Sequence, residues 1–168
     1  MARIPLVAVE TMTPEQRAQY DRFPSNLTRA LLVVEPRLAR ALPELANALR
    51  ASGFDRKWRE GVILRVAALS GSAYERMEHL EQAQKVGWTT AEIAAIEAGD
   101  AGPLPDAFAA LMAFVDACVS SPRVADSLFA EARSVVSDRD LATVILLVGH
   151  YDDRALPRDP RRRARPDT

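Results

Sequence analysis

Apolar residues recur along this chain at the spacing of buried helices. In the middle of the chain they form one broad stripe, in which Val62, Val66 and Leu69 follow one another at intervals of three or four residues. A second helical pattern begins after Gly71 and ends at Gly87. The two patterns predict a pair of antiparallel helices joined by a short turn.

Helix-start signatures divide the rest of the chain. Thr13 and Thr89 are each followed, three residues later, by Gln16 or Glu92, which is the pattern of a capping box. Pro43 lies within another helical pattern and predicts a kink or a break there. No segment shows the alternation of a strand, so the sequence predicts an all-α fold. Besides the central pair, helices are expected after Thr13 and Thr89 and over residues 27–34, 36–51, 105–119, 124–136 and 138–151.

The composition favours one domain with a small-molecule ligand. With 168 residues, 48% of them hydrophobic, the chain is long enough for one substantial core. A formal net charge of −1 gives no overall field that would attract nucleic acid or an anionic membrane. The apolar stretches are far shorter than a membrane span, and the single cysteine, Cys118, excludes an intramolecular disulfide. We therefore expect a cytoplasmic protein that does not bind membranes or nucleic acid.

Three regions are expected along the chain. Residues 1–24 form an N-terminal segment with a short helix, residues 25–151 form the main helical domain, and residues 152–168 form a tail. The tail is rich in Arg, Asp and Pro and has almost no large apolar side chain, so it cannot bury enough surface to offset the entropy of ordering it. We expect it to be disordered and solvated rather than to bind nucleic acid as a basic arm.

Two side chains in the second helix of the central pair can exchange protons. Glu75 and His79 are four residues apart, which places them on one face of a helix, and Ser72 lies about one turn before them. A neighbouring carboxylate stabilises the imidazolium form of a histidine, whereas burial opposes it. On spacing alone, an ordinary ion pair at the helix surface is the commoner interpretation.

The surrounding sequence resembles the carboxymuconolactone decarboxylase-like family. The layout of its core motif is present as Glu60, eleven further residues, and then the segment Ser72–His79. The resemblance spans about residues 25–151 and implies an all-α, alkylhydroperoxidase D-like helical bundle with a central antiparallel helix hairpin. Other stretches that look like this family are Arg59–Ala67, Gly87–Ile93 and Val148–Tyr151.

The motif departs from the alkylhydroperoxidase D branch of the family at its centre. In that branch a Cys-x-x-Cys pair stands at the start of the second helix, with a histidine four residues after it and a glutamate twelve residues before it. Glu60 and His79 occupy the positions of that glutamate and histidine, whereas Ser72 and Glu75 replace the two cysteines. A hydroxyl and a carboxylate supply neither the thiolate nor the resolving thiol of a thiol peroxidase. Peroxidase activity is therefore not expected.

The resemblance implies acid–base chemistry on a small molecule instead. His79 is expected to be the general acid or base, Glu60 its orienting partner, and Glu75 a second acid or a charge that tunes the histidine. Decarboxylation, isomerisation or a lactone reaction of a small carboxylic acid would use these groups. The alternative is a non-catalytic protein that binds a small molecule or serves as an assembly module. Candidate substrate-binding side chains are Ser72, Tyr74, Trp58 and His150, of which Trp58 and His150 also fit as packing residues.

No cofactor and no metal are expected at this site. Two carboxylates and a histidine could bind Mn, Fe or Zn, with an open coordination position for catalysis. The resemblance does not imply a metal, however, and the sequence offers no second well-placed histidine.

The expected assembly is a homo-oligomer. Members of the family usually form trimers or hexamers, and the apolar stretches at residues 107–119 and 141–148 exceed what a small monomer needs to bury. Arg65 lies within an otherwise apolar helix, so it should either pair with a buried carboxylate or reach a subunit interface.

Overall fold

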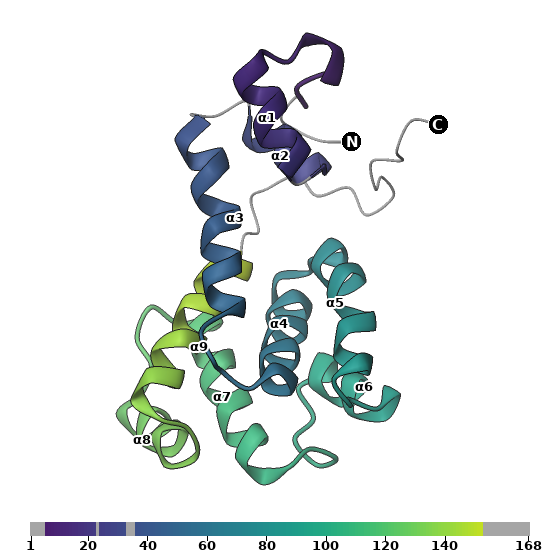
Figure 1. Ribbon diagram of the computed structural model, residues 1–168. Helices are drawn as coiled ribbons and strands as arrows, with labels where there is room; N and C mark the ends of the chain where they lie inside the picture. The colour runs from purple at the N-terminus through teal and green to yellow at the C-terminus, as the bar shows by residue number, and fades with distance from the viewer. Residues whose placement is uncertain (1–5, 23, 33–35, 153–168) are drawn as a thin grey trace. The chain divides into compact units, whose positions relative to one another are not determined.

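The computed structural model describes residues 6–22, 24–32 and 36–152, where helices are joined by turns and loops and no strand occurs (Figure 1). The predicted all-α fold is thereby confirmed. Contacts divide the chain into two compact units, with the division between Ala48 and Leu49. Within the described ranges, no helix has the length and hydropathy that crossing a membrane requires. The predicted tail lies, except for Asp152, outside the described residues.

The first unit is built from short helices. Its elements are a 3-10 helix (Val9–Thr11), α1 (Pro14–Arg22), α2 (Asn26–Leu31) and most of α3 (Pro36–Arg50). The capping box expected at Thr13 forms, since the Thr13 amide donates to Gln16 Oε1 at 3.0 Å and the Gln16 amide donates to Thr13 Oγ1 at 3.2 Å. Ser25 caps α2 in a similar way, because its hydroxyl oxygen accepts from the amide of Thr28 at 3.0 Å.

The helix α3 continues through Pro43 without a break. The predicted break is therefore wrong, whereas the alternative of a kink stays a prediction. A proline within a helix removes one amide donor, here the one that would pair with the carbonyl of Ala39. The leucine, alanine and arginine residues on both sides favour the helix strongly enough to keep it continuous.

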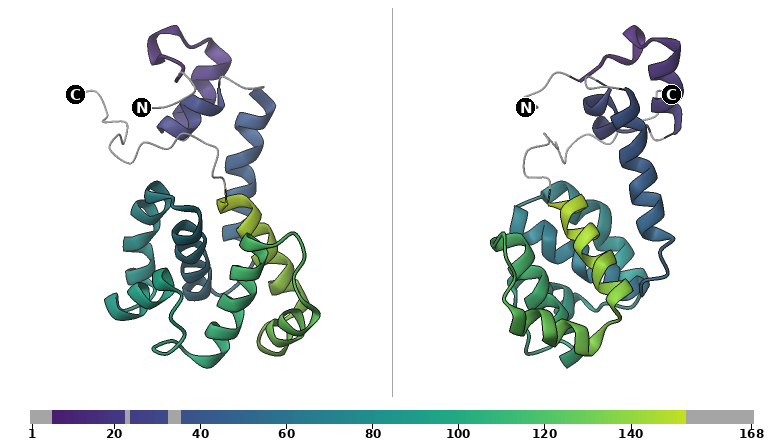
Figure 2. Two further views of the ribbon diagram at one scale, coloured as in Figure 1. Left: turned by 180° about the vertical axis from the view of Figure 1, so that it is seen from behind. Right: turned by 90° about the vertical axis from the view of Figure 1, so that its left-hand side faces the viewer.

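The second unit is built around one central helix. Its complete helices are α4 (Arg56–Ser70), α5 (Ala73–Lys85), α6 (Thr90–Ala98), α7 (Asp106–Ser120), α8 (Asp126–Val135) and α9 (Asp138–Tyr151). The helix α4 packs against α5, α6, α7 and α9, as the two views of Figure 2 also show. This central position explains why α4 is buried without interruption from Arg59 to Ala67 and carries few polar residues there.

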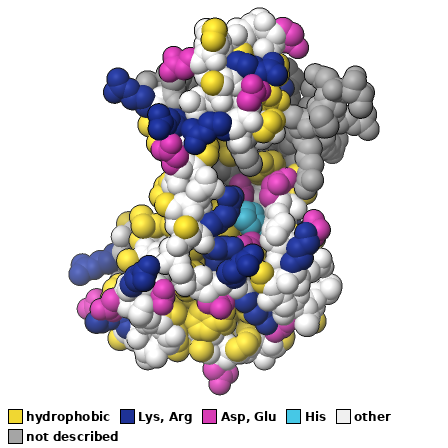
Figure 3. All heavy atoms as spheres, viewed as in Figure 1, with side chains coloured by type: hydrophobic (Ala, Val, Ile, Leu, Met, Phe, Trp, Pro, Cys, Tyr) yellow, Lys and Arg dark blue, Asp and Glu magenta, His cyan; other side chains and the backbone are white. Residues whose placement is uncertain are grey.

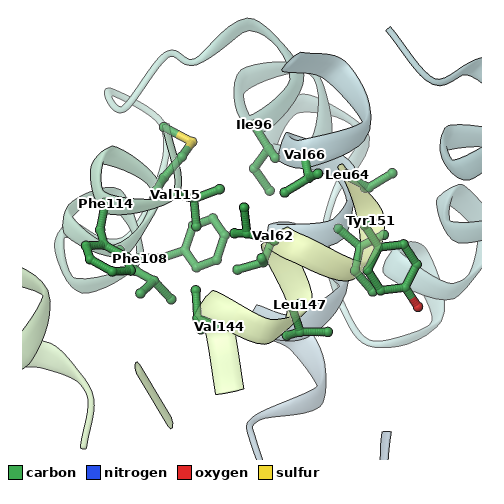
Figure 4. Packing of buried hydrophobic residues seen from close by; sticks show 14 of the residues in the cluster. Val62, Leu64, Val66, Ile96, Phe108, Phe114, Val115, Val144, Leu147 and Tyr151 are labelled. Carbon is green, nitrogen blue, oxygen red and sulfur yellow. The ribbon is translucent and has the colours of Figure 1, made fainter. Parts of the chain in front are cut away.

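The core of this unit joins α4 to the helices around it. Figure 4 shows its closely packed side chains, among them Val62, Val66, Ile96, Val115 and Leu147. Gly61 allows the closest approach, because a Cβ atom at this position would lie 2.5 Å from Cζ of Phe108 and 3.1 Å from Cζ2 of Trp88. Phe108 can therefore reach the backbone of α4 only because residue 61 has no side chain.

Arg65 pairs with a carboxylate as expected, but this carboxylate is not buried, since the side chain of Asp116 is 36% exposed. Its Nε and Nη2 atoms donate to the two carboxylate oxygens of Asp116 at 2.6 and 2.7 Å. Its Nη1 atom also donates to the carbonyl oxygens of Ile96 and Glu97, at the end of α6. One guanidinium thus joins α4, α6 and α7 while its charge is compensated.

The two tryptophans anchor the start of α4. Trp88 is buried, and its Nε1 atom donates to the carbonyl of Lys57 at 2.6 Å. Trp58 packs edge-on against Phe108, with 5.7 Å between the ring centroids, and Trp88 lies 4.7 Å from the same ring. Both tryptophans thus pack against the same phenylalanine, and a substrate-binding role for the partly buried Trp58 stays a prediction.

Candidate active site

A two-residue turn brings the candidate catalytic residues onto adjacent helices. Asp55 begins α4, where its carboxylate accepts from the Trp58 amide at 2.8 Å, and Gly71 ends this helix with a left-handed φ of 68°. Ser72 then begins α5, and its hydroxyl oxygen accepts from the amide of Glu75 at 3.3 Å. The chain reverses here, so that α5 packs back along α4 (Figure 1).

His79 lies between two carboxylates that it contacts through different ring nitrogens. Its Nδ1 atom is 2.7 Å from Oε2 of Glu60, and its Nε2 atom is 3.5 Å from Oε2 of Glu75. The side chains of Glu60 and Glu75 are 5% and 6% exposed, whereas that of His79 is 13% exposed. The structure thus brings together the three predicted catalytic residues and leaves the imidazole as the most accessible of them. In Figure 3 a histidine side chain reaches the surface, bordered by acidic and basic side chains.

Arg59 fixes the carboxylate of Glu60. Its Nε and Nη2 atoms donate to Glu60 Oε1 at 3.1 and 2.9 Å, while its Nη1 atom donates to the carbonyl of Arg50 at 3.2 Å. Burial alone would raise the pKa of Glu60, but the hydrogen bonds and charges of His79 and Arg59 outweigh it and lower that pKa below its ordinary value. Glu60 is therefore an ionised acceptor with both oxygens engaged.

The state of Glu60 determines where the protons of His79 lie. An ionised carboxylate cannot donate, so Nδ1 of His79 carries the hydrogen of the 2.7 Å bond. A bare Nε2 opposite an ionised Glu75 would set lone pairs against each other. A proton on Nε2 or on the carboxyl of Glu75 would remove this repulsion, and the 3.5 Å separation lets such a proton pass between the two groups.

The geometry does not favour a metal ion between these three residues. Glu60 and Glu75 approach opposite edges of one imidazole ring, so their oxygens do not converge on a common point beside either nitrogen. In the described part of the chain, no three His, Cys, Asp or Glu side chains are grouped so that they could hold a metal ion.

Tyr151 and His150 extend the site from the end of α9. The Tyr151 ring stands edge-to-face to His79 and to His150, with centroid distances of 5.3 and 4.8 Å. In Figure 4 the Tyr151 hydroxyl points away from the apolar cluster. Burial raises the pKa of this hydroxyl, so it stays protonated near neutral pH.

His150 is an uncharged neighbour of the site near neutral pH. Burial lowers its pKa, and the positive charges of Arg50 and His79 lower it further. Its Nδ1 atom is enclosed and has no hydrogen-bond partner among the described residues. His150 thus lies within the electrostatic range of His79, as a pocket role would require, and its ring contact with Tyr151 also fits the packing role.

The other predicted binding residues have different positions. Ser72 is a helix cap whose hydroxyl oxygen accepts a backbone amide, and Tyr74 is half-buried on the first turn of α5. The indole of Trp58 is partly buried and packs edge-on against Phe108 of the core. Of these three residues, Ser72 and Tyr74 are the nearest to Glu75 in the sequence, and both precede it.

Two residues of the site were not predicted from the sequence. Arg59 immediately precedes Glu60, and Tyr151 immediately follows His150. The presence of an arginine in the first turns of a buried helix was a signal, because a buried cation requires a carboxylate or a carbonyl as its partner. The tyrosine gave no such signal, since its contact with His79 depends on how α9 packs against α4.

Comparison with known proteins supports the resemblance in sequence. A model of the carboxymuconolactone decarboxylase family matches residues 36–117, a range that includes Glu60, Glu75 and His79. A solved structure from Agrobacterium tumefaciens, a protein of unknown function proposed to be the antioxidant defence protein AhpD, matches with a TM-score of 0.65. It is 21% identical, and the match covers 70% of this chain and 83% of that one. At this identity the likeness shows the fold, which is the expected AhpD-like bundle. Comparison with curated proteins gave no match.

Proposed function

Because this chain belongs to the carboxymuconolactone decarboxylase-like family, we propose that it is a cofactor-independent enzyme that transfers a proton on a small carboxylic acid or lactone. The supporting observation is the contact of His79 with two buried carboxylates through its two different ring nitrogens. General acid–base catalysis requires a group that can gain and lose a proton while its geometry stays fixed.

The two carboxylates have different roles in this proposal. Glu60 is held by Arg59 and His79 and has a lowered pKa, so it orients the imidazole and stays ionised. Glu75 faces the other nitrogen at 3.5 Å and exchanges the mobile proton with it. A substrate that approaches the exposed part of His79 would lose a proton to this pair, or receive one from it.

The substrate class follows from what such a pair can remove. A carbon acid next to a carboxyl or lactone carbonyl gives an enolate on deprotonation, and this intermediate precedes isomerisation or follows loss of carbon dioxide. A hydroxyl must then stabilise the enolate oxygen, and the protonated Tyr151 hydroxyl is the nearest candidate on α9, with Ser72 and Tyr74 as candidates on α5.

A thiol peroxidase function is disfavoured for this chain. The positions of the redox cysteines hold Ser72, which caps α5, and Glu75, which faces His79. Cys118 lies on α7, and burial raises the pKa of its thiol, which disfavours the reactive thiolate.

Solvent deuterium exchange tests the proposal directly. A thermal-shift screen of small carboxylic acids and lactones would first find ligands that stabilise the protein. Each ligand is then incubated with the protein in deuterium oxide, and proton NMR follows exchange at the carbon next to its carbonyl, together with any product. Wild-type protein should exchange or convert at least one of them, and His79→Ala should not.

Two variants separate a catalytic effect from a folding effect. Glu75→Gln keeps the shape of the side chain and should lose exchange while it still binds the ligand. Glu81→Gln, on the same helix at an exposed ion pair with Lys85, should behave as wild type. Ligand binding without exchange in the wild-type protein would instead support the alternative of a non-catalytic binding protein. Full activity of a folded His79→Ala variant would overturn the assignment of His79.

A further inference from the structure

The helix α9 has one face in the core and one face in solvent. Its core face carries Leu141, Val144, Leu147, Val148 and Tyr151, all of which are buried. The opposite face is also apolar, because Ala142, Ile145, Leu146 and Gly149 follow one another at helical spacing and all are exposed. The exposed fractions of Ile145 and Leu146 are 45% and 55%. In the right-hand view of Figure 2, α9 lies in front of the other helices of its unit.

This exposed stripe is symmetric in the size of its residues. Ile145 and Leu146 lie at its middle, and the small residues Ala142 and Gly149 lie one turn away on either side. Apart from its chain neighbours and the backbone of α9 itself, a Cβ atom on Gly149 would meet no described atom within 4 Å. A second helix can therefore approach both ends of the stripe closely.

The ends of the stripe carry opposite charges. Arg139 lies one turn before Ala142, and Asp152 lies one turn after Gly149. Arg139 donates from Nη2 to the carbonyl of Ser52 at 2.7 Å, and its guanidinium has further donors. A parallel copy of this helix would place arginine beside arginine. An antiparallel copy places arginine beside aspartate at both ends.

We propose that α9 pairs with α9 of a second copy of this chain, antiparallel, about a two-fold axis that passes between Ile145 and Leu146. In this arrangement Ile145 of one copy lies against Leu146 of the other, and Ala142 lies against Gly149. Arg139 of one copy lies beside Asp152 of the other. Each contact occurs twice, as an interface between identical surfaces requires.

The proposal does not depend on the proposed enzymatic function, and it distinguishes between the two expected assemblies. A hexamer of two stacked trimers contains two-fold axes, whereas a lone trimer contains only a three-fold axis. One helix face is small beside the roughly 800 Å² per partner of a standard stable interface. If α9 is the main contact, association should therefore depend on protein concentration.

Sedimentation velocity over a range of concentrations tests the interface. Wild-type protein should form a dimer, or a hexamer that contains the same contact. Leu146→Asp should raise the dissociation constant of that contact by about 100-fold, because each pairing would bury two uncompensated charges. Leu38→Asp is the matched control, since Leu38 on α3 is 56% exposed, and it should leave the association unchanged. A monomer at every concentration, a lone trimer, or equal effects of both variants would overturn the proposal.

Disulfide trapping tests the direction of the pairing. Ala142→Cys and Gly149→Cys proteins, purified separately and then mixed under oxidising conditions, should give cross-linked dimers that contain one chain of each kind. Neither protein alone should cross-link through α9, because an antiparallel pair keeps each of these positions about 10 Å from its own copy along the helix axis. Wild-type protein, which retains Cys118, sets the background. Cross-linking of each variant with itself and none in the mixture would overturn the antiparallel arrangement.

Discussion

The Nδ1 atom of His79 lies 2.7 Å from Oε2 of Glu60, although these residues are nineteen positions apart and belong to different helices. This bond closes the α4–α5 hairpin at the site and orients the imidazole. Arg59 holds the other oxygen of the same carboxylate at 2.9 and 3.1 Å. The bond therefore stabilises the hairpin only while Glu60 is ionised.

Glu60→Gln should lower stability near neutral pH and much less in acid. Because the pKa of Glu60 is lowered in the folded protein, its ionisation contributes stability that is fully present above the ordinary value of 4.5. This contribution is lost as the pH falls through the lower pKa of the folded state. The variant should be less stable by about 1–3 kcal/mol at pH 7, and the difference should shrink below pH 4.5. Urea unfolding at several pH values measures it.

An exposed carboxylate supplies the control for this experiment. Glu81 is 69% exposed in its side chain and pairs with Lys85 at the surface of α5. Glu81→Gln should change stability little at any of these pH values. A difference between wild type and Glu60→Gln that stays constant through the acid range would contradict the role given to the ionised carboxylate.

Glu75→Gln should reduce turnover without a comparable loss of binding. The amide keeps the size of the side chain but cannot exchange a proton with Nε2 of His79, which lies 3.5 Å from the carboxylate in the wild type. Loss of one general acid–base partner typically costs about 10²–10⁴-fold in rate. The measurement is kcat against KM for a substrate found by deuterium exchange. A change confined to KM would show that Glu75 only binds the substrate.

Gly61→Ala should destabilise the core by about 1–3 kcal/mol. The added methyl group would lie 2.5 Å from Cζ of Phe108, a ring that is completely buried and packed between Trp58 and Trp88. Gly149→Ala is the matched control, because a Cβ atom there would have no described atom within 4 Å apart from its chain neighbours and the backbone of its own helix. In a helix the control should be neutral or gain about 0.5–1 kcal/mol. Thermal unfolding of dilute protein compares the two variants, and equal effects would contradict the packing at Gly61.

Local signals made the hairpin predictable from the sequence. The stripe on α4, the glycine at position 71 and the cap at Ser72 act within a few residues, so spacing alone locates both helices. Glu60 and His79 required the family resemblance, since nothing local shows that they meet. The contact of Arg59 with Glu60 was not predicted, because neighbouring positions on a helix point in different directions. The two residues meet only because the arginine side chain is long.

Pro43 shows the opposite failure, in which a local rule gave the wrong result. The proline predicted a kink or a break, but α3 has no break there because its other residues favour a helix. Tyr151 shows a third case. Its contact with His79 depends on the packing of α9 against α4, which periodicity does not specify.

His150→Gln should remove part of the loss of stability in weak acid. Burial, with the charges of Arg50 and His79, lowers the pKa of His150 below its ordinary value of 6.5, so the folded protein favours the neutral ring. Below pH 6.5 the unfolded chain binds a proton at this residue before the folded chain does.

Unfolding then becomes easier as the pH falls, by at most about 1.4 kcal/mol per pH unit for one proton. Glutamine cannot bind this proton. The range to test is about pH 5.5 to 7.5, one pH unit on either side of the ordinary pKa of 6.5. Over this range, urea unfolding should show a smaller decrease in the free energy of unfolding for the variant than for wild type. Parallel decreases in the two proteins would mean that His150 is as easily protonated in the folded state as in the unfolded chain.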